Sequence, residues 1–358
     1  VMLSYQHAYH AGNLADLHKH ALIAAALDYL TRKDKPLSYL ETHSGRGLYH
    51  LDSDEARKTG EAEAGILRAR QQGWLPPTHP LIAAIDATRR LHGTQAYPGS
   101  PLIAAHFLRP GDSAHLAELH PVEHAALSRV AGFATLHRQD GFRMAQAVCP
   151  PAPRRGVLLV DPSYEVKADY DTIPRQIAQI ARKWNVGIIA LWYPILTDDR
   201  HRAMLDTLMQ AGPQALRTEI RFAPARPGHG MVGSGMWVLN PPFGLDAEAR
   251  RLEATFRAGQ AMSQSLSISA PIFIVLTLSL GLYFAFAAVQ GPSGILRRIQ
   301  VEAETAELRE QRDELRAQVN RIQNLTRRLS DEYLDLDLLD ERAREILGYV
   351  RADEVILR

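Results

Sequence analysis

The sequence predicts an α/β fold in which residues 1–258 form a mostly parallel, doubly wound sheet with helices on both faces. Short apolar runs typical of strands recur along this part of the chain. Stretches with helical periodicity, such as residues 170–184, separate several of these runs. Alternation of this kind is typical of parallel sheets built from β–α–β units. The expected strands are 37–41, 115–119, 133–138, 156–161, 186–193, 215–222 and 234–240.

The composition of the chain changes abruptly near residue 262. All 15 histidines, all 4 tryptophans and every lysine precede this point. The net charge of the whole chain is only +1, so no overall electrostatic field favours nucleic acid. The single cysteine, Cys149, excludes an internal disulfide framework and suits a reducing compartment. The composition therefore indicates two different proteins joined near residues 259–261.

An uncharged apolar segment follows this change in composition. No charged residue occurs in residues 263–296. Residues 270–289 match the roughly 20 residues that a helix needs to cross a bilayer. We therefore expect a junction over 259–267 and a transmembrane helix over 268–289. A buried core helix is the alternative.

A glycine-containing loop, ETHSGRG over residues 41–47, follows the first expected strand. Gly45 and Gly47 let the backbone turn sharply and approach a ligand closely. The chain has no G-x-x-x-x-G-K-S/T motif, which argues against a nucleoside triphosphate cradle. A lone pair of glycines is weak evidence for a ligand loop, so this loop is informative only together with the acids that follow.

Three acidic residues, Glu118, Asp140 and Asp161, follow later strands. The carboxyl ends of parallel strands meet at one edge of the sheet, and ligands bind there. A carboxylate at such a place can accept hydrogen bonds from ribose hydroxyls. One acid alone is commonly a solvated loop residue. The ordered series of glycine loop and acids is what favours a ligand site.

The segment VLLVDPSYE, residues 157–165, ends an apolar strand with an acid, a proline and a tyrosine. An exocyclic amino group on an aromatic base is a poor nucleophile, because its lone pair is delocalised into the ring. Hydrogen bonds to the Asp161 carboxylate and the Pro162 carbonyl would localise that lone pair, and Tyr164 would stack on the base for ~1–3 kcal/mol. Holding the nitrogen ~3–3.5 Å from a methyl sulfonium would supply most of the remaining acceleration. Such a base must first leave its stack.

Residues 2–257 resemble the ribosomal RNA large subunit methyltransferase J family. The matching stretches occur in order: MLSYQHAYHAGNLADLHKH, YLETHSGRGLYHL, YPGSPLIA, ELHP, DGF, DPSYE, LWYP and GSGMWVLNPP. The resemblance implies a class I S-adenosylmethionine-dependent methyltransferase, with a Rossmann-like sheet and a helical insertion at about 53–96. It also implies methylation of adenine N6 in large-subunit (23S) rRNA, protein-free or at an assembly stage, by a monomeric cytoplasmic domain. A DNA adenine-N6 methyltransferase ranks lower, because no separate base-reading domain is visible.

The resemblance assigns roles to individual residues. Asp161, Pro162 and Tyr164 are expected to be catalytic, and Tyr5 and Lys19 are expected to contact the substrate RNA. The residues expected to contact the cofactor, S-adenosylmethionine, are His20, His43, Gly45, Ser100, Glu118, Asp140, Gly141 and Asp161.

Ser163 departs from the family pattern, which has proline at the third position of this motif. The change frees the loop slightly, by ~0.4–1 kcal/mol through the unfolded chain, so we expect activity to survive. The spacing of the N-terminal histidines fits no standard zinc pattern, so no metal is expected. These histidines are His7, His10, His18 and His20.

Apolar residues seven positions apart follow the expected span: Val301, Leu308, Leu315, Ile322 and Leu329. This heptad pattern predicts a coiled coil over 295–333. The companion seam positions are mostly polar, which favours a partner helix over a self-sufficient homodimer. A lone solvated helix is the alternative.

Residues 262–358 resemble the septum formation initiator family of bacterial division proteins. One span, a coiled coil and the ending AREILGYVRADE occur in that order, the last within a C-terminal segment over 334–358. This implies division-complex partners and a tether to the bacterial inner membrane. The alternative function is therefore a membrane-anchored division protein with the enzyme as a fused passenger. A gene fusion, a frameshift or an assembly error would each explain the junction before Met262.

Overall fold

The computed structural model describes residues 7–224, 230–265, 295–328 and 334–348. The chain divides into two compact units, Val1–Ala261 and Met262–Arg358. The sheet belongs to the first unit.

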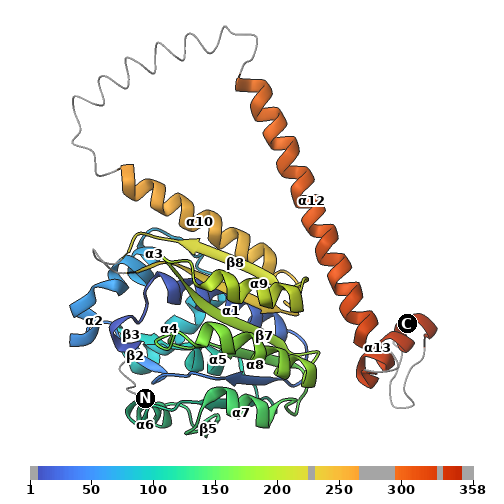
Figure 1. The fold of residues 1–358 in the computed structure, drawn as a ribbon, viewed down its shortest axis with the longest axis horizontal. Helices are drawn as coiled ribbons and strands as arrows, with labels where there is room; N and C mark the ends of the chain where they lie inside the picture. The colour runs from blue at the N-terminus through green and yellow to red at the C-terminus, as the bar shows by residue number, and fades with distance from the viewer. Residues whose placement is uncertain (1–6, 225–229, 266–294, 329–333, 349–358) are drawn as a thin grey trace. The chain divides into compact units, whose positions relative to one another are not determined.

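Seven strands form one sheet in the order β5-β4-β1-β6-β7-β9-β8 (Figure 1). The first five run parallel, whereas β9 is antiparallel to both of its neighbours. The chain fills one half of the sheet outward from β1 and then the other half outward from β6, so the switch point lies between these two strands. The strands are β1 (Ser38–Glu41), β4 (Ser113–Ala117), β5 (Thr135–His137), β6 (Gly156–Val160), β7 (Ile188–Leu196), β8 (Leu216–Arg221) and β9 (Met231–Leu239). Each of the seven strands expected from the sequence overlaps one of them.

Side chains of the central strands alternate between two hydrophobic cores. On β6, Val157 and Leu159 enter one core, and Leu158 and Val160 enter the other. All five residues of this strand are buried. A strand covered on both faces is therefore a continuous apolar run rather than an alternating one.

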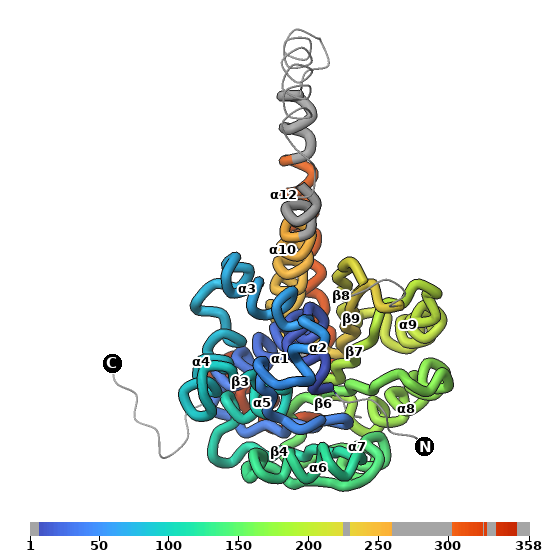
Figure 2. Tube along the Cα trace, turned by 90° about the vertical axis from the view of Figure 1, so that its left-hand side faces the viewer, coloured from blue at the N-terminus to red at the C-terminus, as the bar shows by residue number. Residues whose placement is uncertain are grey.

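Helices cover both faces of the sheet and lie on opposite sides of β6 in Figure 2. The core on the Val157 side receives side chains from α1 (Leu14–Thr31), α5 (Ser100–Phe107), α6 (Pro121–Ser128) and α10 (Leu245–Ser265). The core on the Leu158 side receives side chains from α7 (Gly141–Val148), α8 (Asp169–Lys183) and α9 (His201–Ala211). The doubly wound α/β arrangement expected from the sequence is therefore confirmed.

A helical segment lies between two short strands, β2 (Leu48–His50) and β3 (Ala96–Pro98). These strands pair in a separate two-stranded sheet, which was not expected from the sequence. The segment contains α2 (Asp54–Thr59), the π-helix η2 (Glu63–Leu67), α3 (Arg68–Gln71) and α4 (Pro80–His92). The 3-10 helix η1 (His7–Tyr9) precedes α1 and packs against α2. η1 and the helical segment thus form one contact region.

The second unit contains two described helices, α12 (Ile295–Arg328) and α13 (Leu336–Leu347). Leu308, Leu315 and Ile322 are exposed along α12. The Asp335 carboxylate caps α13 by accepting a hydrogen bond from the Leu338 N–H at 3.1 Å. α12 covers most of the expected heptad segment, and its pairing in a coiled coil stays a prediction.

The expected fold class needs one correction, which concerns the transmembrane helix. No helix in the described part of the chain is long and apolar enough to cross a membrane. The expected span, residues 268–289, lies outside the described residues. The expectation rested on length and lack of charge, and those two properties do not by themselves establish a membrane-spanning helix.

Gly156 on β6 pairs with Ser38 on β1, and a Cβ at Gly156 would be 1.9 Å from the Ser38 carbonyl oxygen. Gly156→Ala should therefore separate the two central strands and lower the free energy of unfolding by about 1–3 kcal/mol, the usual range for overpacking. Gly132→Ala is the matched control, because nothing lies within 4 Å of its added Cβ. Chemical denaturation checks both, and equal stabilities for the two variants would contradict the prediction.

Candidate active site

The carboxyl ends of β1, β4, β5 and β6 meet at one edge of the sheet, as their parallel registers require. Thr42 follows β1, Glu118 follows β4, Asp140 lies just beyond β5 and Asp161 follows β6. Because β1 and β6 flank the switch point, the glycine loop and Asp161 face the same crevice. The structure thus brings the expected strand-end residues to one edge.

Glu118 fixes the glycine loop. One of its carboxylate oxygens accepts a hydrogen bond from the Gly45 N–H at 2.8 Å, and the other accepts one from the His120 N–H at 2.7 Å. Gly45 has a φ of 58°, in the left-handed region that favours glycine. Burial raises the pKa of Glu118 against the effect of these two hydrogen bonds. One side chain therefore sets both the end of β4 and the shape of the loop after β1.

The start of α7 packs directly against the same loop. A Cβ at Gly141 would lie 2.0 Å from the Thr42 carbonyl oxygen, so this close approach requires glycine. Asp140 caps α7 by accepting a backbone hydrogen bond at 2.8 Å. Phe142 meets the His43 ring edge-on, with the centroids 6.0 Å apart. Burial lowers the pKa of His43, which favours the neutral imidazole at neutral pH.

A buried ion-pair cluster centres on Lys19. The Lys19 Nζ lies 2.6 Å from Asp161 Oδ2 and 3.1 Å from Asp16 Oδ1. It also lies 5.6 Å from the centroid of the Trp192 ring, and the residue is only 4% exposed. Because a buried ammonium needs counter-charges, the two carboxylates hold Lys19, and Lys19 in turn holds Asp161. The expected contact of Lys19 with RNA would need more access than this burial provides.

Asp16, one turn before Lys19 in α1, is 1% exposed. Its Oδ2 accepts a hydrogen bond from the Gly12 N–H and lies 2.9 Å from His7 Nε2. Burial would raise the pKa of Asp16, but its interactions with His7 and Lys19 outweigh burial and hold the pKa well below its usual range. Asp16 is therefore an ionised partner for Lys19.

Glu41, at the end of β1, is fully buried. The Ser100 hydroxyl donates to one of its oxygens, and the Tyr39 hydroxyl donates to the other at 2.9 Å. Burial raises the pKa of Glu41 to about 8, although both hydrogen bonds oppose the shift. Ser100, an expected cofactor contact, is thus engaged with a carboxyl group beneath the crevice.

His20 is buried in the same region, with its Nδ1 2.8 Å from the Tyr97 hydroxyl. His18 lies on another side of α1, with its Nδ1 3.1 Å from Ser234 Oγ. Burial lowers the pKa of each histidine to about 3, so both are neutral. Within the described residues, no group of three or more His, Cys, Asp and Glu side chains could hold a metal ion.

The four side chains of the Asp161-Pro162-Ser163-Tyr164 motif differ in how far they are buried. Pro162 is buried and Ser163 is exposed. Tyr164 has a φ of 56° and is 8% exposed, and its hydroxyl donates to the Trp192 carbonyl oxygen at 2.8 Å. Burial raises the pKa of Tyr164 well above its usual value. The Tyr164 ring therefore offers little free face for a base in this conformation.

Three residues of the cluster had no role assigned from the sequence: Asp16, Glu41 and Trp192. Asp16 precedes Lys19 and His20 by three and four positions on one helix, and that spacing would have placed all three on one face. Glu41 was noted only as the end of a strand. Tyr5, an expected RNA contact, lies outside the described residues.

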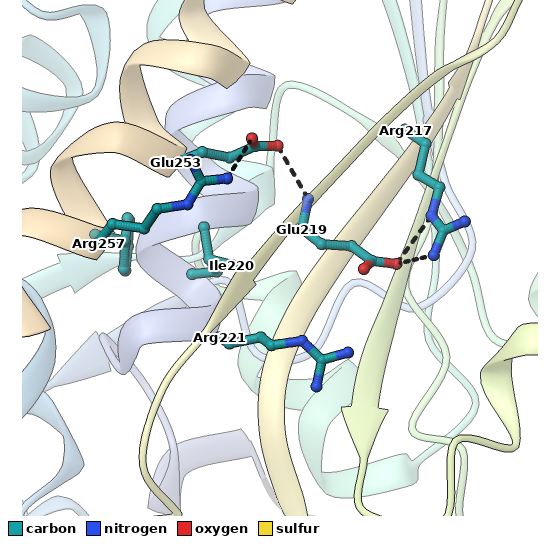
Figure 3. Close-up of a pocket in the computed structure, with 7 residues that line it drawn as sticks. Arg217, Glu219, Ile220, Arg221, Glu253 and Arg257 are labelled. Atoms are coloured by element: carbon teal, nitrogen blue, oxygen red, sulfur yellow. Dashed lines mark hydrogen bonds and ion pairs between the residues drawn. The ribbon is translucent and has the colours of Figure 1, made fainter. Parts of the chain in front are cut away.

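A separate groove runs along β8 and α10 (Figure 3). Two ion pairs line it, Arg217 with Glu219 at 2.7 Å and Arg257 with Glu253 at 3.5 Å. β8 is the edge strand, separated from β6 by β7 and β9, so the groove lies apart from Asp161. It is lined by Arg217, Glu219, Ile220, Arg221, Glu253, Phe256 and Arg257, none of which is an expected site residue.

The residues around the glycine loop fit S-adenosylmethionine. Ser44 Oγ is buried and has no hydrogen-bond partner among the described residues, so a polar ligand group would satisfy it. Glu118 and Asp140 offer acceptors for hydroxyl and amino groups. Leu119 and Val122, which follow Glu118 closely in the chain, are 47% and 61% exposed and offer apolar surface.

The strand order, the glycine loop and the acids at successive strand ends define a class I S-adenosylmethionine-dependent methyltransferase. The family described as ribosomal RNA large subunit methyltransferase D, RlmJ, matches residues 34–265, and the chain belongs to this family. A second family, the septum formation initiator, matches residues 280–358. Both resemblances expected from the sequence are therefore confirmed, and the cofactor is S-adenosylmethionine.

Curated relatives and a solved structure support this membership. Ribosomal RNA large subunit methyltransferase J of Escherichia coli is 40% identical over 252 residues, which cover 69% of this chain and 90% of the relative. The protein of the same name from Haemophilus influenzae is 38% identical over 259 residues, covering 70% and 92%. A crystal structure of a Legionella pneumophila protein, 34% identical, covers 70% of this chain and 96% of its own with a TM-score of 0.63.

The raised pKa of Glu41 predicts how stability depends on pH. A carboxyl group that titrates near 8 when folded, against 4.5 in the unfolded chain, retains its proton in the folded state across that window. The contribution of Glu41 to the free energy of unfolding is complete below the pKa of the unfolded chain and is lost as the pH rises towards 8. Raising the pH from about 5 to about 8 should therefore destabilise the wild type more than Glu41→Gln, by on the order of 1–3 kcal/mol. Thermal melts across this range check the difference, and parallel curves for the two proteins would refute it.

Proposed function

We propose that the first unit transfers a methyl group from S-adenosylmethionine to N6 of an adenine in large-subunit rRNA. The observation that supports this most directly is the Asp161 carboxylate beside the switch point, with its Oδ2 held 2.6 Å from Lys19 Nζ. The curated relatives are named as ribosomal RNA large subunit methyltransferases, and this supports the substrate class. The adenine-N6 specificity rests on the Asp-Pro-Ser-Tyr motif.

In this proposal Asp161 and Pro162 activate the exocyclic amine. Lys19 occupies Oδ2 of Asp161, so Oδ1 would accept one N–H of the adenine amine while the Pro162 carbonyl accepts the other. The two hydrogen bonds localise the lone pair on N6, which attacks the methyl carbon. The surplus proton of N6 would leave through the hydrogen-bonded Asp161 carboxylate. The bound cofactor would supply the methyl group as an electrophilic sulfonium, with its sulfur as the leaving group.

The proposal assigns roles to the remaining candidate residues. The glycine loop, His43, Glu118, Asp140 and Gly141 would hold the cofactor. His20 and Ser100 would support this site from beneath, because both are buried against other side chains. Tyr164 would stack on the flipped base once the loop that follows β6 shifts to uncover one face of its ring. Tyr5 would meet the RNA, as the family resemblance implies.

Replacing Asp161 tests this mechanism. Asp161→Asn removes the charge that localises the lone pair but preserves the size of the side chain, and Asp16 still neutralises Lys19. The kcat for labelled methyl transfer into protein-free large-subunit rRNA should fall by about 100- to 1000-fold, as when one preorganised electrostatic contact is lost. Ser163→Pro, which restores the usual motif at an exposed position, is the control and should change kcat only a few-fold. Full activity of Asp161→Asn would disprove the mechanism, and label in duplex DNA rather than rRNA would favour the DNA alternative.

We infer a second function for the second unit, as a partner in cell division. The match of residues 280–358 to the septum formation initiator family supports it, and so do Leu308, Leu315 and Ile322, exposed at heptad spacing on α12. A partner helix with a heptad seam complementary to that of α12 would cover these side chains. Residues 334–358 would form the segment that distinguishes this family from other coiled coils.

Substitutions on α12 separate the two functions. Leu308→Glu with Leu315→Glu places charges in the heptad seam and should abolish rescue of cells that lack their own septum formation initiator, scored by filamentation. Methyl transfer to rRNA should be unchanged. Glu310→Gln, on the opposite side of the heptad, should preserve both. Rescue by the double variant at the wild-type level would exclude this role for α12.

A further inference from the structure

The helical segment between β2 and β3 contacts the residues that precede α1 at several points. Glu61 receives a hydrogen bond from Asn13 Nδ2 at 3.0 Å, and His10 Nδ1 lies 3.0 Å from both Glu61 oxygens. The Thr59 hydroxyl donates to the Tyr9 carbonyl oxygen. The Glu61 carboxylate is 12% exposed, so these contacts form in a partly desolvated place where hydrogen bonds to a charge are strong.

Asn13 connects Glu61 to the first turn of α1. It is the N-cap residue of the helix, and its Oδ1 accepts a hydrogen bond from the Asp16 N–H at 2.9 Å. The amide nitrogen of Asn13 thus contacts the helical segment, while its amide oxygen fixes the backbone of Asp16. A change at Glu61 reaches Asp16 through a single side chain.

The chain around η2, which is kinked at Gly65, also contacts this turn. The Ile66 N–H donates to the Gly12 carbonyl oxygen at 2.8 Å. A Cβ at Gly65 would lie 2.1 Å from that same oxygen, so the two backbones meet at closest approach. The Gly12 N–H in turn donates to Asp16 Oδ2 at 2.9 Å.

We propose that Glu61 is a positioning residue for methyl transfer, acting through Asn13 and Asp16 on the Lys19–Asp161 pair. Glu61 touches neither the reacting groups nor Asp161. Glu61 fixes Asn13, the N-cap residue of α1, and thereby orients Asp16. Asp16 and Asp161 together hold the Lys19 ammonium. The helical segment is therefore part of the catalytic apparatus as a support for Asp161. This inference rests on the proposed methyl transfer, because Asp161 is placed there by it.

The test compares Glu61→Ala with Glu63→Ala, an exposed residue of the same segment. In the full chain, Glu61→Ala should lower kcat for rRNA methylation by about 10-fold, while KM for rRNA and for S-adenosylmethionine changes less than about threefold. Glu63→Ala should match the wild type. Asn13→Ala should reproduce the kcat loss, and the double variant Glu61→Ala/Asn13→Ala should be no worse than either single variant, because both act along one path.

A readout without RNA separates this inference from the proposed function. Amide hydrogen exchange over residues 12–19 should increase in Glu61→Ala. The Gly12 and Asp16 amides keep their acceptors, Asp16 Oδ2 and Asn13 Oδ1, but these are no longer held in place by Glu61. A wild type inactive on rRNA would refute the proposed function, and exchange unchanged in Glu61→Ala would by itself overturn the positioning role. Additive kcat losses in the double variant, or a KM effect larger than the kcat effect, would overturn it as well.

Discussion

The ion pair between Lys19 and Asp161 constrains the arrangement of the whole site. Both side chains lie largely out of water, where an isolated charge is strongly disfavoured, so Asp161 requires Lys19 as its counter-charge. Lys19 comes from α1 and Asp161 from the end of β6, and the pair therefore ties the first helix to the centre of the sheet. A carboxylate on a loop would otherwise be free to rotate. Here its orientation is set by a helix that packs along the sheet.

The carboxyl groups around Lys19 differ in their protonation, and this difference lets one ammonium balance their charge. Lys19 provides one positive charge in a cluster that contains Asp16, Glu41 and Asp161. Three ionised carboxylates could not be balanced there by one ammonium. Burial resolves the conflict by raising the pKa of Glu41 to about 8, while the surrounding charges hold that of Asp16 well below its usual range. Glu41 then serves as a neutral group between Ser100 and Tyr39, and the charge of Lys19 is left for the two aspartates.

Strand positions and strand-end residues were predictable from the sequence because both follow from local patterns. The apolar run 156–161 could be buried only as a central strand, and parallel neighbours bring Glu118 and Asp161 to one edge whatever the loops do. The partners of the buried side chains were not predictable, since Lys19 and Asp161 are far apart in the chain and only the fold brings them together. For the same reason the burial of Tyr164 was missed: its exposure depends on Tyr170 and Trp192, which arrive from two other elements. The transmembrane expectation rested on length and lack of charge alone, and no helix in the described part of the chain is long and apolar enough to cross a membrane.

The serine at position 163 suits the conformation of the loop that follows β6. Tyr164 adopts a left-handed backbone conformation, which is uncommon for a bulky residue and is held here by the hydrogen bond to Trp192 and by ring packing. A proline at 163 would fix its own φ and also restrict Pro162, making the loop stiffer on both sides. Serine removes that restriction at a solvent-exposed position where it disturbs no packing. If a base is to stack on Tyr164, the loop must give up the buried arrangement of the ring, and a more flexible third position lowers the cost of that movement. Asp161 is not loosened by the same change, because Lys19 holds its carboxylate independently of the loop.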